Sequence, residues 1–294
     1  MTDAATAPLL AFSEGIADLV ARTAPSVVAL RSGRRFPSSG LHWRPGLIVT
    51  SDEALAQDEN IAVLRPDGQA SSASLVGRDP STDIALLRFE ADGMANVETG
   101  DAQSLRAGNL VVAVGRNERG PLASLGVAAL AGDAWHSMRG GLIDRFIRLD
   151  LRMSPSAEGG AMVDAAGHVL GMAVRGPRRL VLGIPASTID RVVDQLLARG
   201  HIARGYLGAG LRPAQQGNET ALLIVGIDPD GPAAQAGLMV GDMIMQWNGQ
   251  AVTRVREVMF LLGPESIGNH VKLALWRGGQ KTEAAITIGE RPRK

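Results

Sequence analysis

The chain has 294 residues, a length that suits about two ordinary domains. Its 30 basic and 30 acidic side chains give a formal net charge of +0, which argues against nucleic acid or an anionic membrane as partner. Because the count of cysteine is 0, disulfides, thiol catalysis and thiolate metal sites are excluded.

The composition is that of a soluble globular protein, with 45% apolar and 20% charged residues. Glycine is abundant at 36 residues and aromatic residues make up only 3%. This mixture favours many turns and strands built from small residues over long helices.

Residues 1–25 are predicted to form an N-terminal segment with one short helix. Phe12, Ile16 and Leu19 follow helical spacing after Ser13, a plausible N-cap, and Pro25 closes the helix.

A secretory signal is not visible in this segment. The first basic residue is Arg22, and the apolar stretch at 7–12 is short, whereas a signal begins with positive charge and continues into a longer apolar run. Nor does any stretch approach the ~18 uninterrupted apolar residues of a membrane span. The sequence as written therefore predicts a cytoplasmic protein, or a periplasmic one if a leader has been removed.

Residues 26–200 are predicted to form a domain of many short strands, including one that holds His42. Turn signals such as Pro45-Gly46 and Pro66-Asp67-Gly68 separate the strands. Short strands without alternating helices are typical of β-sandwiches and barrels. The other predicted strands are 26–31, 46–51, 61–65, 73–76, 84–89, 110–114, 123–130, 146–151, 161–163, 168–174 and 180–184.

A helix closes this domain. Ser187 is a plausible N-cap, an apolar stripe runs from Ile189 to Leu197, and Gly200 suits a left-handed C-terminal residue. A boundary near His201 then leaves residues 201–294 as a second domain of ordinary small size. Strands are predicted there at 221–227, 243–247 and 271–276, with a helix at about 255–262.

Three stretches of the first domain resemble HtrA-like serine proteases. The first is Pro25-Ser26-Val27-Val28 followed by Ser39-Gly40 and by residues 46–55; the second is the segment 79–87; the third is the segment 150–163. The resemblance covers roughly residues 12–291. It implies a mainly β fold, with a trypsin-like double six-stranded β-barrel followed by a PDZ domain, and it implies a homotrimer.

The same resemblance aligns the catalytic histidine with Glu53, the catalytic aspartate with Asp83 and the nucleophilic serine with Glu158. A serine protease needs a hydroxyl nucleophile, a base within hydrogen-bond reach and a carboxylate that orients the base. Only the carboxylate remains, and attack by Glu158 on a peptide would give a mixed anhydride that is more activated than the amide. The resemblance also implies a glycine where Ser156 stands, so the oxyanion hole is in doubt. We therefore expect a proteolytically inactive scaffold, with no cofactor.

His42 and His168 match neither catalytic position and are expected to be ordinary structural or surface histidines.

Two other interpretations stay open for the cleft. Because three converging carboxylates repel one another, Glu53, Asp83 and Glu158 are a candidate oxygen-ligand site for a divalent metal. Alternatively, the chain is an active serine-type endopeptidase in which Glu53 acts as base and Ser156 or Ser154 supplies the hydroxyl, a role of glutamate that resembles acid-acting sedolisins.

The segment 206–211 resembles the carboxylate-binding loop of the PDZ domains in this family. The resemblance implies that Tyr206, Leu207, Gly208 and Ala209 present backbone N–H groups to the C-terminal carboxylate of a peptide, which then adds as a strand to a sheet edge. The predicted helix should line the groove with Val255, Val258 or Met259, and Leu262. The expected partners are therefore peptides or protein C-termini.

Overall fold

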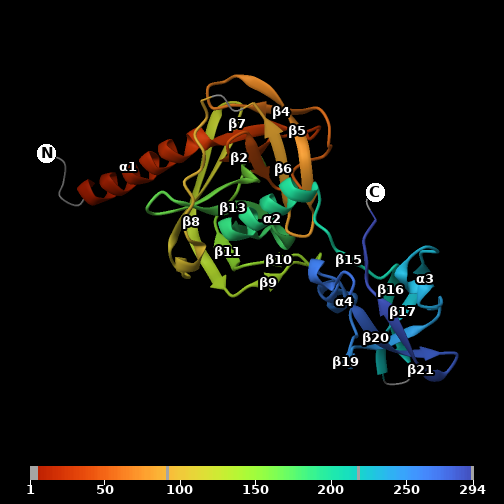
Figure 1. Ribbon diagram of the computed structural model, residues 1–294. Coiled ribbons are helices and arrows are strands. Elements are labelled where there is room, and N and C mark those ends of the chain that lie inside the picture. The colour runs from red at the N-terminus through yellow and green to blue at the C-terminus, as the bar shows by residue number, and fades with distance from the viewer. Residues whose placement is uncertain (1–5, 91–92, 217–218, 293–294) are drawn as a thin grey trace. The chain divides into compact units, whose positions relative to one another are not determined.

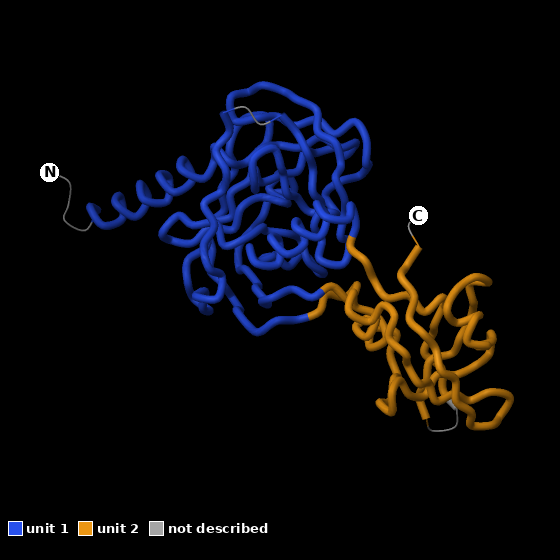
Figure 2. Tube along the Cα trace, viewed as in Figure 1, with its two compact units in different colours: residues 1–135, 142–201 blue, residues 136–141, 202–294 orange. Residues whose placement is uncertain are grey.

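The computed structural model describes residues 6–90, 93–216 and 219–292. The chain divides into two compact units, one of residues 1–135 and 142–201 and the other of residues 136–141 and 202–294 (Figure 2). The described part of the chain has no helix that is long and apolar enough to cross a membrane.

Two closed six-stranded barrels make up most of unit 1, as expected (Figure 1). The strand order of the first barrel is β1-β2-β3-β6-β5-β4. Its core consists of inward-facing aliphatic side chains such as Val28, Ile48 and Leu87, all 0% exposed. The strands are β1 (Val27–Arg31), β2 (Ser38–Arg44), β3 (Leu47–Thr50), β4 (Ile61–Leu64), β5 (Ala70–Asp79) and β6 (Ile84–Phe89).

The second barrel has the order β11-β14-β13-β12-β7-β8. The two short strands β9 (Trp135–His136) and β10 (Leu142–Ile143) pair with each other outside it. The strands of the second barrel are β7 (Leu110–Asn117), β8 (Gly120–Gly132), β11 (Phe146–Asp150), β12 (Gly160–Asp164), β13 (Val169–Arg175) and β14 (Val181–Pro185). A short 3₁₀ turn, η1 (Ala24–Ser26), precedes β1, and others lie between barrel strands at η2 (Ala102–Ser104) and η3 (Pro155–Ala157). The segment η4 (Pro177–Arg179) between β13 and β14 is a turn in which Arg178 has a non-helical φ of 56°.

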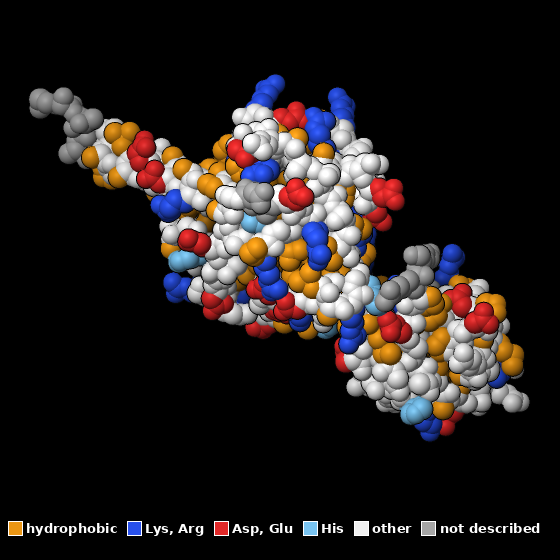
Figure 3. All heavy atoms as spheres, turned by 45° about the horizontal axis from the view of Figure 1, so that its top comes forward, with side chains coloured by type: hydrophobic (Ala, Val, Ile, Leu, Met, Phe, Trp, Pro, Cys, Tyr) orange, Lys and Arg blue, Asp and Glu red, His pale blue; other side chains and the backbone are white. Residues whose placement is uncertain are grey.

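The N-terminal helix is longer than predicted. Helix α1 spans Thr6–Thr23, so Ser13 lies inside the helix and is not its N-cap. The prediction was wrong because it took the apolar spacing near Phe12 as the helix start, whereas the Ala- and Leu-rich stretch before it also favours helix. The first half of α1 projects from the barrels in Figure 1, and apolar side chains lie on its surface in Figure 3.

A buried arginine holds the C-terminal end of this segment. Arg116, 7% exposed, donates from Nε to the carbonyl oxygen of Val27 at 2.6 Å and from Nη2 to that of Ala24 at 3.0 Å. These bonds tie the Arg116 side chain to the turn that precedes β1 and to the first residue of β1.

Helix α2 (Ala186–Arg199) closes unit 1. Its C-cap Gly200 has φ 72°, which confirms the predicted left-handed residue. Its N-cap is Pro185, so the prediction of Ser187 as N-cap was wrong by two residues: Ser187 lies in the first turn, and the φ of proline is already suited to a helix start.

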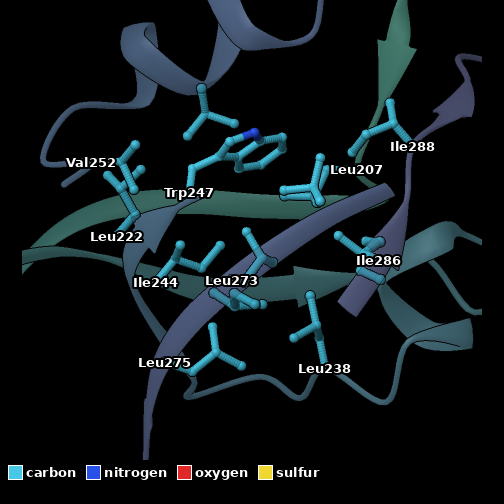
Figure 4. Close-up of a cluster of buried hydrophobic side chains, with 14 residues drawn as sticks. Leu207, Leu222, Leu238, Ile244, Trp247, Val252, Leu273, Leu275, Ile286 and Ile288 are labelled. Atoms are coloured by element: carbon cyan, nitrogen blue, oxygen red, sulfur yellow. The ribbon is translucent and has the colours of Figure 1, made fainter. Parts of the chain in front are cut away.

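Unit 2 contains a twisted sheet of order β16-β17-β18-β20-β21, with β19 on β18, and a separate pair, β15 with β22. Its core is drawn in Figure 4, where Trp247, Leu222 and Leu273 pack within one cluster. The strands are β15 (Gly205–Tyr206), β16 (Ala209–Gln216), β17 (Glu219–Ile227), β18 (Met243–Trp247), β19 (Gln250–Ala251), β20 (His270–Arg277), β21 (Gln280–Thr287) and β22 (Gly289–Glu290). The helical segments are α3 (Pro232–Gln235), α4 (Val255–Leu261) and η5 (Pro264–Ser266).

Candidate functional site

Glu53, Asp83 and Glu158 lie close together in unit 1, as expected. Glu53 follows β3, Asp83 directly precedes β6, and Glu158 follows η3, so both barrels contribute to the site. The backbone N–H of Glu53 donates to Asp83 Oδ1 at 2.8 Å, and the charges of Glu53 and Glu158 both raise the pKa of Asp83.

The described residues contain no group of three or more His, Cys, Asp or Glu side chains arranged to hold a metal ion. The structure therefore gives no support to the metal interpretation.

Asp83 is held by its neighbours in an unusual backbone conformation. Its φ is 60°, in the left-handed region that Asp and Asn tolerate best among residues with a side chain. The Ser51 hydroxyl lies 2.9 Å from each carboxyl oxygen of Asp83. Burial raises the pKa of Asp83 to about 7, and the two neighbouring glutamates add to that rise.

Glu158, which the family resemblance aligns with the nucleophile, is a buried carboxyl group with only 7% of its surface exposed. Burial raises the pKa of Glu158 above its ordinary value. The positive charges of Arg175 and Arg34 and a hydrogen bond from the backbone N–H of Arg175 oppose that rise. Glu158 is thus a buried carboxyl group within the influence of two arginine charges.

The loop before Glu158 forms a closed 3₁₀ turn. The N–H of Ala157 donates to Ser154 O at 3.0 Å, and that of Glu158 donates to Pro155 O at 3.4 Å. The N–H of Ser156 donates to the hydroxyl oxygen of Ser154, the N-cap residue of η3, at 3.4 Å. An oxyanion hole uses the backbone N–H of the nucleophile and of the residue two before it. Here both donors are directed at acceptors within the loop itself.

Ser39 of β2 fastens this loop to the first barrel. Its hydroxyl donates to Ser156 O at 2.6 Å and accepts from Arg116 N at 2.8 Å, while its own N–H donates to Glu158 O at 2.8 Å. The fit is close, because a Cβ on Gly159 would lie 2.4 Å from Ser39 O. Another Cβ on Gly115 would lie 2.5 Å from the Cα of Ala157.

The two histidines nearest in sequence to the site have other partners. His42 is 2% exposed, contacts Ala95 O through Nδ1 at 3.0 Å, and accepts from the N–H of Gly46 at Nε2 at 3.3 Å. Burial lowers the pKa of His42, which favours its neutral form. The Nδ1 of His168 faces Asp164 at 3.4 Å on the surface.

In unit 2, the loop between β15 and β16 has the backbone expected for binding a carboxylate. Gly208 has φ 74°, which glycine adopts without strain. The carbonyl oxygens of Leu207 and Gly208 accept from Ala233 N at 2.8 Å and Asp228 N at 2.9 Å. Within the described chain, the N–H groups of Leu207 and Gly208 have no such acceptor. Two adjacent donors are therefore available for an anion.

The side chains expected to line the peptide groove divide into core and surface. The side chain of Leu207, which was expected to offer its backbone N–H, is 3% exposed and packs in the core. Of the two alternatives on the helix, Val258 is 2% exposed and belongs to the core, whereas Met259 is only partly buried. Val255 and Leu262 are only partly buried against that core, as is Ala209 at the start of β16. Helical spacing alone did not distinguish the inward position from its neighbours.

Tyr206 pairs with Gly289 across β15 and β22, and its hydroxyl donates to Asp228 Oδ2. This bond joins the loop to the segment that follows β17. The strand β16 lies at one edge of the sheet, where an added strand can pair.

Three residues that act on the surroundings of Glu158 were not predicted from the sequence. They are Ser39, whose hydroxyl binds the loop, and Arg34 and Arg175, whose charges act on Glu158. The Ser39-Gly40 pair was a signal for a close approach between strands. Nothing in the sequence near either arginine indicated its neighbour, because each is far from Glu158 along the chain.

Comparisons with known proteins agree with this architecture. Residues 38–172 match the family described as trypsin-like peptidase domain, and residues 205–288 match the PDZ domain family. Probable periplasmic serine endoproteases described as DegP-like are 30% identical in Bartonella henselae, over 94% of this chain and 58% of the relative, and in Halomonas elongata, over 84% and 55%. The chain thus spans somewhat more than half the length of these two relatives.

Solved structures show the same fold over nearly the whole chain. The serine endoprotease from Yersinia pestis has a TM-score of 0.72 and 28% identity, covering 94% of this chain and 98% of that one. The HtrA-type protease AlgW with tripeptide has a TM-score of 0.68 and 26% identity, covering 95% and 98%. With its two barrels, its PDZ domain and these relatives, the chain belongs to the HtrA-like serine protease family.

Proposed function

We propose that this protein is a proteolytically inactive member of its family that binds peptides or unfolded proteins through its PDZ domain, as a scaffold, chaperone or regulator. The observation that carries the proposal is Glu158, a buried carboxyl group in the place of the nucleophile. A carboxyl group cannot replace the serine hydroxyl productively, and position 53 holds a glutamate where the base would stand.

The loop geometry supports inactivity independently of these two replacements. Oxyanion stabilisation requires preorganised donors that face the developing charge, and losing one such donor costs about 10²- to 10³-fold in kcat. In this loop the N–H groups of Ser156 and Glu158 both face acceptors within the turn. Restoring the nucleophile and base alone therefore leaves a poor active site.

Cleavage of unfolded casein between pH 4 and pH 8 tests the proposal. We expect no cleavage by the wild type or Glu158→Ala, and weak cleavage by Glu53→His/Glu158→Ser. Adding Ser156→Gly to that pair should increase cleavage, because glycine frees the backbone of the oxyanion loop. Cleavage by the wild type that Glu53→Ala abolishes would establish instead the competing function, an active serine-type endopeptidase in which Glu53 acts as base.

Peptide binding through unit 2 is supported by the two N–H groups of Leu207 and Gly208 and by the exposed edge of β16. The structural relative AlgW has been solved with a tripeptide. We infer that the present chain also binds peptides, with a small or medium apolar side chain as the terminal residue of the ligand.

Fluorescence anisotropy with labelled peptides ending in Val or Ala separates this mode from unspecific binding. A free C-terminus should bind and an amidated one should not, because only the free carboxylate can accept from both N–H groups. Val255→Glu should weaken binding, whereas Val240→Glu, at a 64% exposed position outside the groove, should not. Equal binding of free and amidated peptides would contradict the proposed mode.

Two further parts of the proposal concern assembly and compartment. The exposed apolar residues Leu9, Leu10 and Phe12 of α1 support association into a homotrimer. The relatives described as periplasmic support a periplasmic location.

A further inference from the structure

The hairpin between β13 and β14 ends in a tight turn, Pro177–Arg179, of unusual sequence. The N–H of Leu180 donates to Pro177 O at 3.2 Å, and the N–H of Gly176 donates to Leu180 O at 2.8 Å. Arg178 and Arg179 occupy the two central positions, with φ 56° and 62°. Two successive left-handed residues define a type I′ turn, a geometry for which Asn-Gly is the usual sequence.

Two arginines at these positions lower the stability of the turn. A residue with a side chain costs roughly 1–2 kcal/mol in the left-handed region because its Cβ crowds the following carbonyl. Among the described residues, neither Arg178 nor Arg179 forms an ion pair with a carboxylate that would offset this cost. Backbone strain that the local contacts do not offset is an indication of function at that position.

Further arginines surround this turn. The strand pairing places Arg175 opposite Val181 and Arg148 opposite Leu182, directly below the turn. Arg152 follows β11, and Nη2 of Arg175 reaches the neighbouring Met153 O at 3.3 Å. Arg175 is paired with Val181, which belongs to the barrel core, and its charge acts on Glu158, so it faces the candidate site. We call the other exposed side chains, Arg148, Arg152, Arg178 and Arg179, the arginine patch.

The patch carries a clear excess of positive charge. The segments 148–152 and 175–180 contain these four arginines together with Arg175, and one acidic residue, Asp150. In the described part of the chain, Arg148 and Arg152 also lack an ion pair with any carboxylate. Since the whole chain has a net charge of +0, this local excess is balanced by acidic residues elsewhere in the sequence.

We propose that the arginine patch is a second binding surface, on unit 1, for an acidic segment of another polypeptide. Guanidinium groups form two parallel hydrogen bonds with a carboxylate, so several adjacent arginines suit a run of Asp or Glu. The two segments contain no aromatic side chain on which a nucleic-acid base could stack. Within these two segments, Leu180 is the large apolar side chain with more than one third of its surface exposed. A single such side chain offers too little apolar surface to insert into a membrane.

Binding of a fluorescein-labelled, Glu-rich 12-residue peptide to the full chain tests this inference. The peptide is acetylated and amidated, so it offers no terminal carboxylate to the PDZ loop, and its binding is independent of the proposed PDZ function. The informative variant is Arg178→Asn/Arg179→Gly, which installs the preferred type I′ sequence. We expect about five-fold weaker binding, because two exposed ion pairs are lost, together with a higher Tm.

The opposite directions of these two effects make the result decisive, since a misfolded variant would not gain Tm. The control variant Arg88→Gln/Arg199→Gln removes the same charge from exposed positions outside the patch and should bind like the wild type. Unchanged binding by the Asn-Gly variant, or an equal loss in the control, would overturn the proposal. Tighter binding of a 15-nucleotide thymidine strand or of phosphatidylglycerol vesicles than of the peptide would also overturn it.

Discussion

The Asp83 carboxyl group makes the folded protein sensitive to pH in the direction opposite to that of a salt-bridged aspartate. Its pKa is about 7 in the folded chain, against 3.8 as the ordinary value, so between these values the folded state binds one more proton than the unfolded state. Stability therefore falls as the pH rises from about 4 to 7, by up to about 4 kcal/mol.

Asp83→Asn should remove this dependence. Asn keeps an acceptor for the N–H of Glu53, carries no charge, and tolerates the φ of 60° at this position. Urea unfolding should show that the variant gains stability relative to the wild type steadily between pH 5 and pH 7. The exposed Asp150→Asn serves as control and should give no such trend. A difference that stays constant with pH would show that Asp83 is ionised in the folded state throughout.

The catalytic loop and β2 act as one packed element, and glycine permits their contact. Gly159 and Gly68 have the same φ of 83°, but a Cβ on Gly159 would lie 2.4 Å from Ser39 O, while Gly68 has nothing within 4 Å. Replacement by alanine therefore separates backbone strain from steric conflict. Gly68→Ala should cost about 1 kcal/mol, the cost of the left-handed conformation alone.

Gly159→Ala should cost about 3 kcal/mol or more, because the added methyl group must also displace backbone atoms of the first barrel. Chemical denaturation of both variants measures the difference. Equal losses for the two variants would mean that the loop is not pressed against β2.

Within single elements, the accuracy of the sequence predictions followed the burial of the strand. Strand β6 and strand β18 match their predicted ranges, 84–89 and 243–247, because both are mostly apolar runs between clear turn signals. Strands β16 and β21 were not predicted. Both lie at sheet edges, and their Gln, Lys and Pro residues reflect exposure more than strand propensity.

For the whole chain, family resemblance supplied what residue patterns could not. Spacing alone gave short strands in a sandwich or barrels, whereas the aligned segments led to the double barrel and to the convergence of Glu53, Asp83 and Glu158. The contacts that Ser39 and Arg175 make with the catalytic loop join residues more than 15 positions apart. Such contacts depend on the packing of one barrel against the other, which neither periodicity nor a local motif encodes.

Helix α1 leads to a test of assembly. Its first half is exposed, with Leu9, Leu10 and Phe12 at 68%, 48% and 45% exposure. Apolar side chains gathered on one projecting helix mark an interaction surface more often than a free one. If the homotrimer forms through this helix, Leu9→Glu/Leu10→Glu/Phe12→Glu should sediment as a monomer at concentrations where the wild type sediments as a trimer.

The control variant Ser13→Glu adds a charge at an exposed polar position of the same helix and should leave the trimer intact. A trimer that survives all three glutamates would place the interface on the barrels, and a monomeric wild type would contradict the homotrimer itself.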